Sequence, residues 1–395
     1  MRTMFRFSAA TITLLLLLTA CSGADDTATT DISDSTTDSS APSGDDAQNA
    51  GSEGDTFRIS FSNFTEEAPL FRVIHTNLDD VIAETGADVE VKWYDNQGDP
   101  AVMLQNTQLM VADDPDALVI YPVSTATGGI SEVVADSGLP CVAVNLDVED
   151  CDFLNIDNAA LGVDTATIIG EEAAARGWDA SNTTILLGQN AAAGEQVNAC
   201  VTHFYSTIAP MLGMEEVAPE DITASTTDIG DNAIQFDGMS QLQPSFEAVS
   251  SLLPGIPAEH NIILYTVNND STTGALRALE EADRGGEDVL LIGGLGGDDT
   301  GITALREDPR WIAEGDIFVG WWGQYAVAMA QALAQGETPP AEVTALPQAV
   351  LTVDEVDTYH APGSSDVLQL PPLDETNSYL AEGGFLQVVD NIEGL

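Results

Sequence analysis

The stretch TFRISFSNFTEEAPLFRVIHTNLDDVIA, residues 56–83, decides the class of fold. Its opening run, Thr56 to Phe61, predicts a strand, and the apolar residues between Pro69 and Ala83 recur at helical spacing. A strand followed directly by an amphipathic helix is the unit from which sheets of parallel strands are built. Repetition of this unit along the chain would therefore predict an α/β fold.

The unit does repeat, in two series. In the first series we expect strands over 89–94, 117–121 and 141–145, and helices over 100–111 and 125–136. In the second we expect strands over 184–188, 221–225, 261–267 and 288–293, and helices over 161–176, 195–212, 242–253 and 273–282. A last helix over 322–334 is expected to return to the first series. The pattern predicts two α/β lobes of similar size, each a parallel sheet flanked by helices.

The composition excludes several classes of protein. The 395 residues include 10 Lys and Arg against 65 Asp and Glu, a formal net charge of −55, and so acidic a surface repels the phosphates of nucleic acids. Because 44% of the residues are hydrophobic, the chain can bury a core and is not disordered throughout. The apolar run from Ala9 to Ala20 is shorter than the roughly 20 residues of a membrane-spanning helix, which argues against a channel or permease.

The N-terminus has the features of an export signal. Residues 1–20 predict a signal peptide, because Arg2 and Arg6 precede an apolar segment that ends in small residues. Leu18-Thr19-Ala20-Cys21 resembles a bacterial lipobox, which predicts a lipidated Cys21 at the outer face of the cytoplasmic membrane. The alternative is an ordinary secretory signal with a chance cysteine. Residues 21–55 are rich in Asp, Ser, Thr, Gly and Ala, and predict a disordered acidic tether.

Three further cysteines follow Cys21. An exported protein meets an oxidising environment, in which a disulfide is expected. Cys141 lies in an apolar run and is interpreted as a core residue. Cys151 and Cys200 are therefore the candidate disulfide pair.

Short motifs at the ends of the predicted strands occur in a recognisable order. They are Ser62-Asn63-Phe64, Pro69-Leu70-Phe71, residues 95–100 (DNQGDP), Ile120-Tyr121-Pro122, Leu139-Pro140, residues 155–158 (NIDN), Asn268-Asn269-Asp270, residues 274–279 (GALRAL) and Ile292-Gly293-Gly294. With them, the region from about Thr56 to His360 resembles type 1 periplasmic solute-binding proteins of sugar ABC importers, the ribose-binding-protein-like group. The resemblance implies three hinge crossovers, near Ile156, Gly320 and Leu346. It implies an N-terminal lobe of residues 56–156 plus about 320–346, and a C-terminal lobe of residues 157–319 plus about 347–395.

The resemblance also implies where the ligand binds. Sugar capture needs planar polar side chains for the hydroxyl groups and aromatic faces for the C–H surfaces. Such candidates are Asn63, Phe64, Phe71, Tyr121 and Asn145 on the first lobe, Asn198, Asn269, Asp270 and Asp298 on the second, and Trp321 beside a crossover. Phe64 and Phe71 could instead belong to the lobe core, and Asp270 could simply cap a helix. Packing in the hinge is the alternative role for Trp321.

The chain departs from the pentose-binding members of this group. Where they have an Asp-Arg pair it has Asn145-Leu146, and where they have an arginine in a later helix it has Asn198. Without these guanidinium groups, a small neutral or cationic polar ligand fits better than an acidic sugar or a phosphate.

The function implied by the resemblance is that of a monomeric substrate-binding lipoprotein of an ABC importer. It would capture a sugar or polyol by hinge closure and deliver it to a membrane permease. A nucleoside-binding lipoprotein and a ligand-sensing receptor subunit are the alternatives, since both use the same fold. We expect no enzyme activity, cofactor or metal: the glycine run 293–297 lacks the lysine of a phosphate-binding loop, and no nucleophile elbow accompanies the four histidines.

Overall fold

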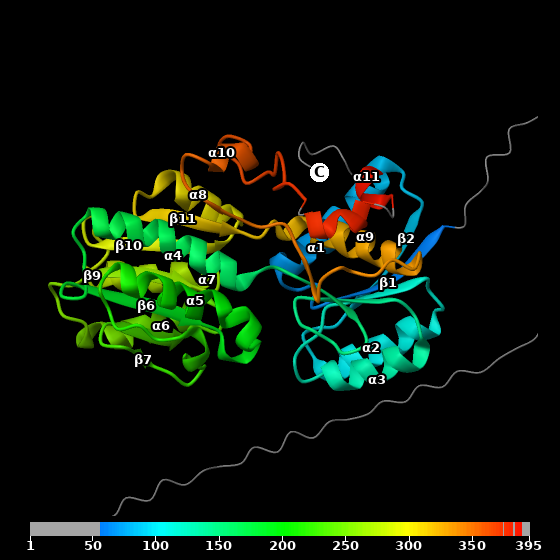
Figure 1. The fold of residues 1–395 in the computed structure, drawn as a ribbon, viewed down its shortest axis with the longest axis horizontal. Helices are drawn as coiled ribbons and strands as arrows, with labels where there is room; N and C mark the ends of the chain where they lie inside the picture. The colour runs from blue at the N-terminus through cyan, green and yellow to red at the C-terminus, as the bar shows by residue number, and fades with distance from the viewer. Residues whose placement is uncertain (1–55, 374, 382–383, 389–395) are drawn as a thin grey trace, which may run out of the picture. The chain divides into compact units, whose positions relative to one another are not determined.

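The computed structural model describes residues 56–373, 375–381 and 384–388 (Figure 1). The predicted signal peptide, the lipidated Cys21 and the tether lie outside the described residues. None of the helices in the described part is both long and apolar enough to cross a membrane.

The first lobe is a six-stranded sheet in which all neighbouring strands are parallel, in the order β12-β5-β4-β3-β1-β2. Its strands are β1 (Phe57–Asn63), β2 (Val89–Asp95), β3 (Ala117–Ile120), β4 (Cys141–Val144), β5 (Asp152–Asn155) and β12 (Val343–Ala345). Its helices are α1 (Pro69–Thr85), α2 (Pro100–Ala112), α3 (Thr127–Ser137) and α9 (Trp322–Ala334). The central strands β3 and β4 are buried along their whole length, as expected of strands covered on both faces.

The second lobe is a seven-stranded sheet in the order β13-β11-β10-β9-β6-β8-β7, parallel except for its two edge strands. Its strands are β6 (Thr183–Gln189), β7 (Asp228–Ile229), β8 (Ala233–Asp237), β9 (Asn261–Thr266), β10 (Leu290–Gly296), β11 (Trp311–Asp316) and β13 (Ala349–Leu351). Its helices are α4 (Asn158–Ala175), α5 (Glu195–Met211), α6 (Leu242–Leu252), α7 (Asn269–Glu281), α8 (Asp299–Glu307) and α10 (Val356–Tyr359). The predicted fold class, two parallel α/β lobes, is confirmed.

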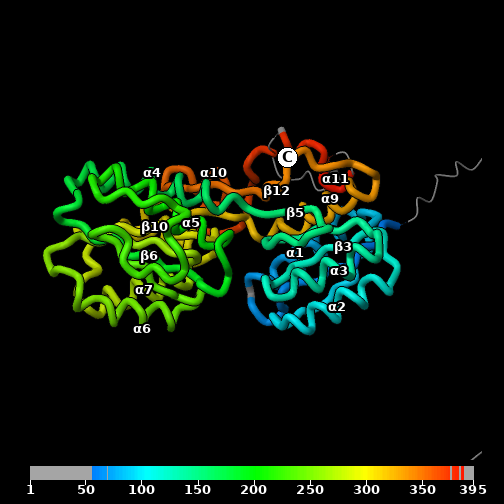
Figure 2. The backbone as a smooth tube through the Cα atoms, turned by 60° about the horizontal axis from the view of Figure 1, so that its bottom comes forward, coloured from blue at the N-terminus to red at the C-terminus, as the bar shows by residue number. Residues whose placement is uncertain are grey.

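The chain passes between the two sheets three times, after β5, after β11 and between β12 and β13. These places agree with the expected crossovers. The last segment then differs from the expected C-terminal lobe of residues 347–395, because the 3-10 helix η5 (Glu375–Ala381) and α11 (Phe385–Val388) pack against α9 of the first lobe (Figure 2). The Tyr379 hydroxyl lies 2.6 Å from Thr344 Oγ1, and Asn377 Nδ2 donates to the carbonyl oxygen of Ala345. Phe385 and Leu380 are buried in the first-lobe core and anchor this segment to the first lobe.

The predicted strand over 221–225 is wrong. Asp221 ends the 3-10 helix η2 (Pro219–Asp221), and the residues after it form a loop. The carbonyl groups of this loop do not pair with a strand, because the side-chain amides of Gln189 and Gln235 donate to them. The strands of this region are β7 and β8, which begin further along the chain at Asp228 and Ala233, and neither was predicted. β5, β11 and α8 were missed as well.

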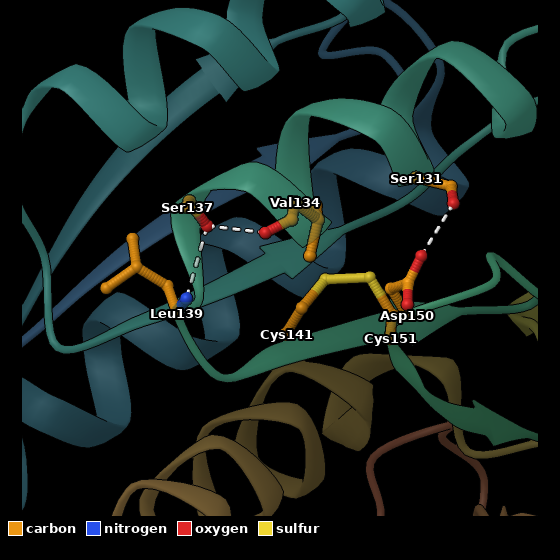
Figure 3. Close-up of a disulfide and its surroundings, with 7 residues drawn as sticks. All are labelled: Ser131, Val134, Ser137, Leu139, Cys141, Asp150 and Cys151. Carbon is orange, nitrogen blue, oxygen red and sulfur yellow. Dashed lines mark hydrogen bonds between the residues drawn. A yellow bond between two sulfur atoms is a disulfide. The ribbon is translucent and has the colours of Figure 1, made fainter.

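The predicted disulfide is also wrong. Cys141 is bonded to Cys151 (Figure 3). Cys200 is a buried free thiol on α5. The physical reason is strand pairing: β4 and β5 are parallel neighbours, so the residues at their amino ends lie side by side, with 4.6 Å between the two cysteine Cα atoms. Burial raises the pKa of the Cys200 thiol to about 12, so this cysteine stays protonated and unreactive.

Candidate ligand-binding site

Three aromatic rings meet at the carboxyl ends of β1 and β3. The ring centres of Phe64 and Phe71 lie 4.7 Å apart, and that of Tyr121 lies 5.2 Å from Phe71 and 6.0 Å from Phe64. Trp322, at the start of α9, lies parallel to Tyr121 at 6.3 Å. Phe64 and Phe71 are half-buried and Tyr121 is buried, so part of this cluster faces outward. We call Phe64, Phe71 and Tyr121 the aromatic cluster.

Asn63 holds the aromatic cluster in place through the hydrogen bonds of its side chain. Its side chain is fully buried, and Nδ2 donates to Glu66 Oε1 and to the carbonyl oxygen of Phe71. Its Oδ1 accepts from the backbone N–H of Phe64. These bonds use both amide hydrogens, so Asn63 is placed to fix the two phenylalanines.

Two first-lobe candidates present polar atoms that the protein itself does not use. Asn145 follows β4 with a left-handed φ of 70° and a half-buried side chain, and its amide makes no hydrogen bond to any described residue. The Tyr121 hydroxyl likewise has no partner among residues 56–373, 375–381 and 384–388, and burial raises its pKa so that it remains a hydrogen-bond donor. Because β3 and β4 are parallel neighbours, the Tyr121 hydroxyl and the Asn145 amide are both available at the carboxyl edge of the first-lobe sheet.

In the second lobe, the amide of Asn198 is used within the protein. This buried side chain on α5 donates to the carbonyl oxygens of Asn190 and Gly194, and its Oδ1 accepts from the N–H of Asn190. It thereby holds the turn between β6 and α5.

Asn269, at the start of α7, is part of a buried network that was not predicted from the sequence. Its Nδ2 donates to Asp298 Oδ1 at 2.9 Å and to Glu314 Oε1 at 2.7 Å, and its Oδ1 accepts from the N–H of Leu295. Glu314 also accepts from the N–H of Gly297 and, through Oε2, from Trp311 Nε1. The donors favour the charged carboxylate, but burial outweighs them and raises the pKa of Glu314 to about 8.

The glycines in and just after β10, together with Gly301 in α8, make room for this network. A Cβ at Gly294 would lie 1.8 Å from Glu314 Oε2, and one at Gly301 would lie 2.3 Å from Glu314 Oε1. Gly297 has a φ of +70°, and a Cβ there would lie 1.8 Å from Asp316 Oδ1. The glycines thus form a cradle for two buried carboxylates, which gives them a structural role.

The second lobe exposes two carboxylates at this edge, Asp270 and Asp298. Asp298 Oδ1 caps α8 by accepting from the N–H of Gly301, in addition to its bond from Asn269. Loss of hydration, followed by the charge of Asp298, raises the pKa of Asp270. The helix N-cap of α7 is Asn268, so Asp270 is not the capping residue.

The crossover after β11 is held by a second buried pair. His360 Nε2 lies 2.5 Å from Asp316 Oδ2, and both side chains are 1% exposed. Asp316 Oδ1 accepts from the N–H of Phe318, whose φ of 43° is left-handed. Trp321 follows in the 3-10 helix η4 (Val319–Trp321) and is half-buried, whereas its neighbour Trp322 is the tryptophan beside Tyr121. Asp316 and His360 were missed; the signal available for Asp316 was the presence of two carboxylates, Glu314 and Asp316, in an otherwise apolar stretch.

Comparison with known proteins places the chain in a family. The family model described as a periplasmic binding protein domain matches residues 59–338. The xylitol-binding protein of Mycolicibacterium smegmatis is 24% identical over 283 residues, which cover 68% of this chain and 70% of that protein.

Solved structures share the fold. An ABC-transporter solute-binding protein from Mycobacterium smegmatis, solved with bound glycerol, has a TM-score of 0.62 at 19% identity and covers 79% of this chain and 99% of its own. The periplasmic component of the arabinose ABC transporter from Shewanella sp. ANA-3 has a TM-score of 0.61 at 16% identity and covers 76% of this chain and 93% of its own. Because the family model spans more than half of the sequence, the chain belongs to the periplasmic binding protein family, whose members are extracytoplasmic binding proteins and not enzymes.

Proposed function

We propose that the protein captures a small neutral sugar or polyol between the strand ends of its two lobes and delivers it to an ABC permease. The observation that supports this most lies at the carboxyl edge of the first-lobe sheet. There the hydroxyl of Tyr121, within the aromatic cluster, and the amide of Asn145, just after the neighbouring strand β4, bond to no described residue. Hydroxyl groups of a sugar would pair with the amide and hydroxyl, and its C–H faces would pack on the rings. The xylitol-binding relative and the glycerol-bound structure have ligands of this chemical class.

The second lobe would contribute Asp270 and Asp298, whose exposed carboxylates accept hydrogen bonds from hydroxyl groups. Asn63, Asn198 and Asn269 would act indirectly, by fixing the loops that present these groups. A ligand that bridges both lobes selects the closed state, and inverting a 1:99 open preference takes about 5.5 kcal/mol of differential affinity.

The same proposal covers the N-terminus. Cys21 would be lipidated at the outer face of the cytoplasmic membrane, and residues 22–55 would tether the folded part as a monomer that meets its permease by diffusion. Mass spectrometry of the N-terminal peptide from membranes would reveal the diacylglyceryl cysteine, and a soluble unlipidated product would contradict this part.

The ligand is tested by thermal melting of residues 22–395 against pentoses, hexoses, linear polyols, inositols and nucleosides. A ligand at a hundredfold excess over its Kd stabilises the native state by about 2.7 kcal/mol, which a melt registers. A shift with a sugar or polyol supports the proposal. A shift with nucleosides alone would replace it by the nucleoside-binding alternative, and no shift with any compound would favour a sensor of another ligand.

Asn145→Gly is the site-directed test, because glycine keeps the left-handed backbone at no steric cost and removes a side chain whose amide bonds to no described residue. We expect the Kd to rise more than tenfold with an unchanged melting temperature. An unchanged Kd would remove Asn145 from the site.

A further inference from the structure

The connection between β4 and β5 is unusually short for two parallel strands. Their register pairs Val142 with Asp152 and Val144 with Leu154, so the chain must return from the carboxyl end of β4 to the amino end of β5. Only residues 145–151 make this return, without a helix. Parallel neighbours usually need a crossover of about a dozen residues or more. The connection, which we call the short crossover, is therefore tightly constrained.

The short crossover contains two non-glycine residues with left-handed backbone. Asn145 has a φ of 70° at its first position, and Asp150 has a φ of 71° just before its end. L-residues occupy this region only when the surroundings enforce it. The restraints seen are the N–H of Asn145 donating to the carbonyl oxygen of Leu154, the buried side chain of Val148, and Ser131 Oγ donating to Asp150 Oδ2.

The Cys141–Cys151 disulfide joins the first residue of β4 to the last residue of the short crossover (Figure 3). It thereby closes the ring of chain that contains Asn145, with the sulfur bridge on the side opposite to the carboxyl end of β4. A bond that closes such a ring removes extended conformations of the connection. The residue held at the far side of this ring is Asn145, the half-buried asparagine whose amide bonds to no described residue.

We propose that the Cys141–Cys151 disulfide is a positioning device for Asn145, so that ligand affinity depends on the oxidation state of this bond. The inference rests on the proposed ligand contact of Asn145. Reduction by a dithiol would break the S–S bond, leave two thiols, and convert the dithiol to its own disulfide. Without the disulfide, the short crossover would adopt more extended conformations. The side-chain amide of Asn145 would then no longer be held in one orientation. The lobe core would remain, because β3, β4 and α3 pack through residues other than the two sulfurs.

The test compares the double variant Cys141→Ala/Cys151→Ala with the matched control Cys200→Ala, which removes a buried thiol that makes no disulfide. Two readouts are used: amide hydrogen exchange of residues 145–151 without ligand, and the Kd for xylitol together with any panel compound that shifts the melt. In the double variant we expect at least tenfold faster exchange at Asn145 and at least a tenfold higher Kd, and no change in either for Cys200→Ala. Adding Asn145→Gly to the double variant should weaken binding much less than it does in the parent.

Wild-type protein reduced with dithiothreitol is the second measurement, in case the double variant does not fold. Exchange at Asn145 and a Kd that both stay within twofold of the oxidised protein would overturn the inference. Additive effects of Asn145→Gly and disulfide loss would overturn it too, since they would indicate general destabilisation. If no compound binds, the exchange readout still decides whether the disulfide orders the short crossover, and only the proposed function fails.

Discussion

The strand ends of the two lobes differ in how their polar groups are satisfied. In the first lobe the Asn145 amide and the Tyr121 hydroxyl have no partner among the described residues. In the second, Asn269 and Glu314 are buried and bonded to each other. An asparagine at a strand end can thus be a free ligand group or an internal tie, and its partners decide which. The difference suggests that the first lobe supplies specificity and the second a rigid counter-surface.

The largest effect is expected from disturbing the glycine cradle of the second lobe. In Gly294→Ala the new methyl group would lie 1.8 Å from Glu314 Oε2 and 2.5 Å from the Trp311 ring, both of which are buried. We expect a loss of about 3 kcal/mol or more in the free energy of unfolding, measured by urea denaturation.

Gly128→Ala in α3 of the first lobe is the matched control, since a methyl group added there would meet nothing within 4 Å beyond its chain neighbours and the backbone of its own helix. A glycine replaced in a helix should leave stability unchanged or raise it by up to about 1 kcal/mol. Equal losses in both variants would show that the cradle is not specially packed.

The next largest effect is a difference between Asn269 and Asn145 in the free energy of unfolding. Asn269→Ala removes the amide that donates to buried Glu314 and to Asp298, and a buried polar group that loses its partner costs about 1–3 kcal/mol. We expect urea unfolding to show a loss of about 2 kcal/mol for Asn269→Ala, but no measurable loss for Asn145→Gly. If Asn269→Ala were as stable as the parent yet bound ligand weakly, Asn269 would be a ligand group and not an internal tie, and the contrast between the two asparagines would fail.

The sequence predicted the elements whose signals are local. The helix predicted over 322–334 has the bounds of α9, and the first-lobe strands β1 to β4 lie on the apolar runs for which strands were predicted. Glu314 could not be assigned, because its partners at positions 269, 297 and 311 come together only through strand order. The disulfide failed for the same reason: it depends on the parallel pairing of β4 with β5, and β5 itself was missed.

The candidate site was predictable as a location more than as a set of contacts. The location was predicted correctly, since Asn63, Tyr121 and Asn145 lie at or just after the carboxyl ends of strands, and Asn269 begins the helix that follows β9. Which of these residues have side-chain atoms available for a ligand depends on hydrogen bonds between residues that are far apart in the sequence. Whether any of them contacts a ligand stays a prediction.

A smaller effect should be seen in the pH dependence of stability. Burial raises the pKa of Glu314 from its ordinary 4.5 to about 8 in the folded state, so the folded protein binds this proton more tightly than the unfolded chain. The contribution of Glu314 to stability therefore decreases, with a negative slope, as the pH rises from about 4.5 to 8. Glu314→Gln cannot titrate, and the difference between the two urea-unfolding curves from pH 5 to pH 8 should show this slope. Parallel pH profiles would mean that Glu314 titrates normally and that the second lobe is less rigidly buried than its geometry indicates.

The smallest effect tests the free hydroxyl of the first lobe. Tyr121→Phe removes one oxygen atom that bonds to no described residue and keeps the ring contacts with Phe64 and Phe71. Stability should therefore stay within about 0.5 kcal/mol of the parent, as for a group with no native partner. A hydrogen bond to a ligand is worth about 0.5–1.5 kcal/mol, so the Kd measured by calorimetry should rise about threefold to tenfold. A clear loss of stability with an unchanged Kd would show that the hydroxyl serves the fold, and the first lobe would then resemble the second in satisfying its own polar groups.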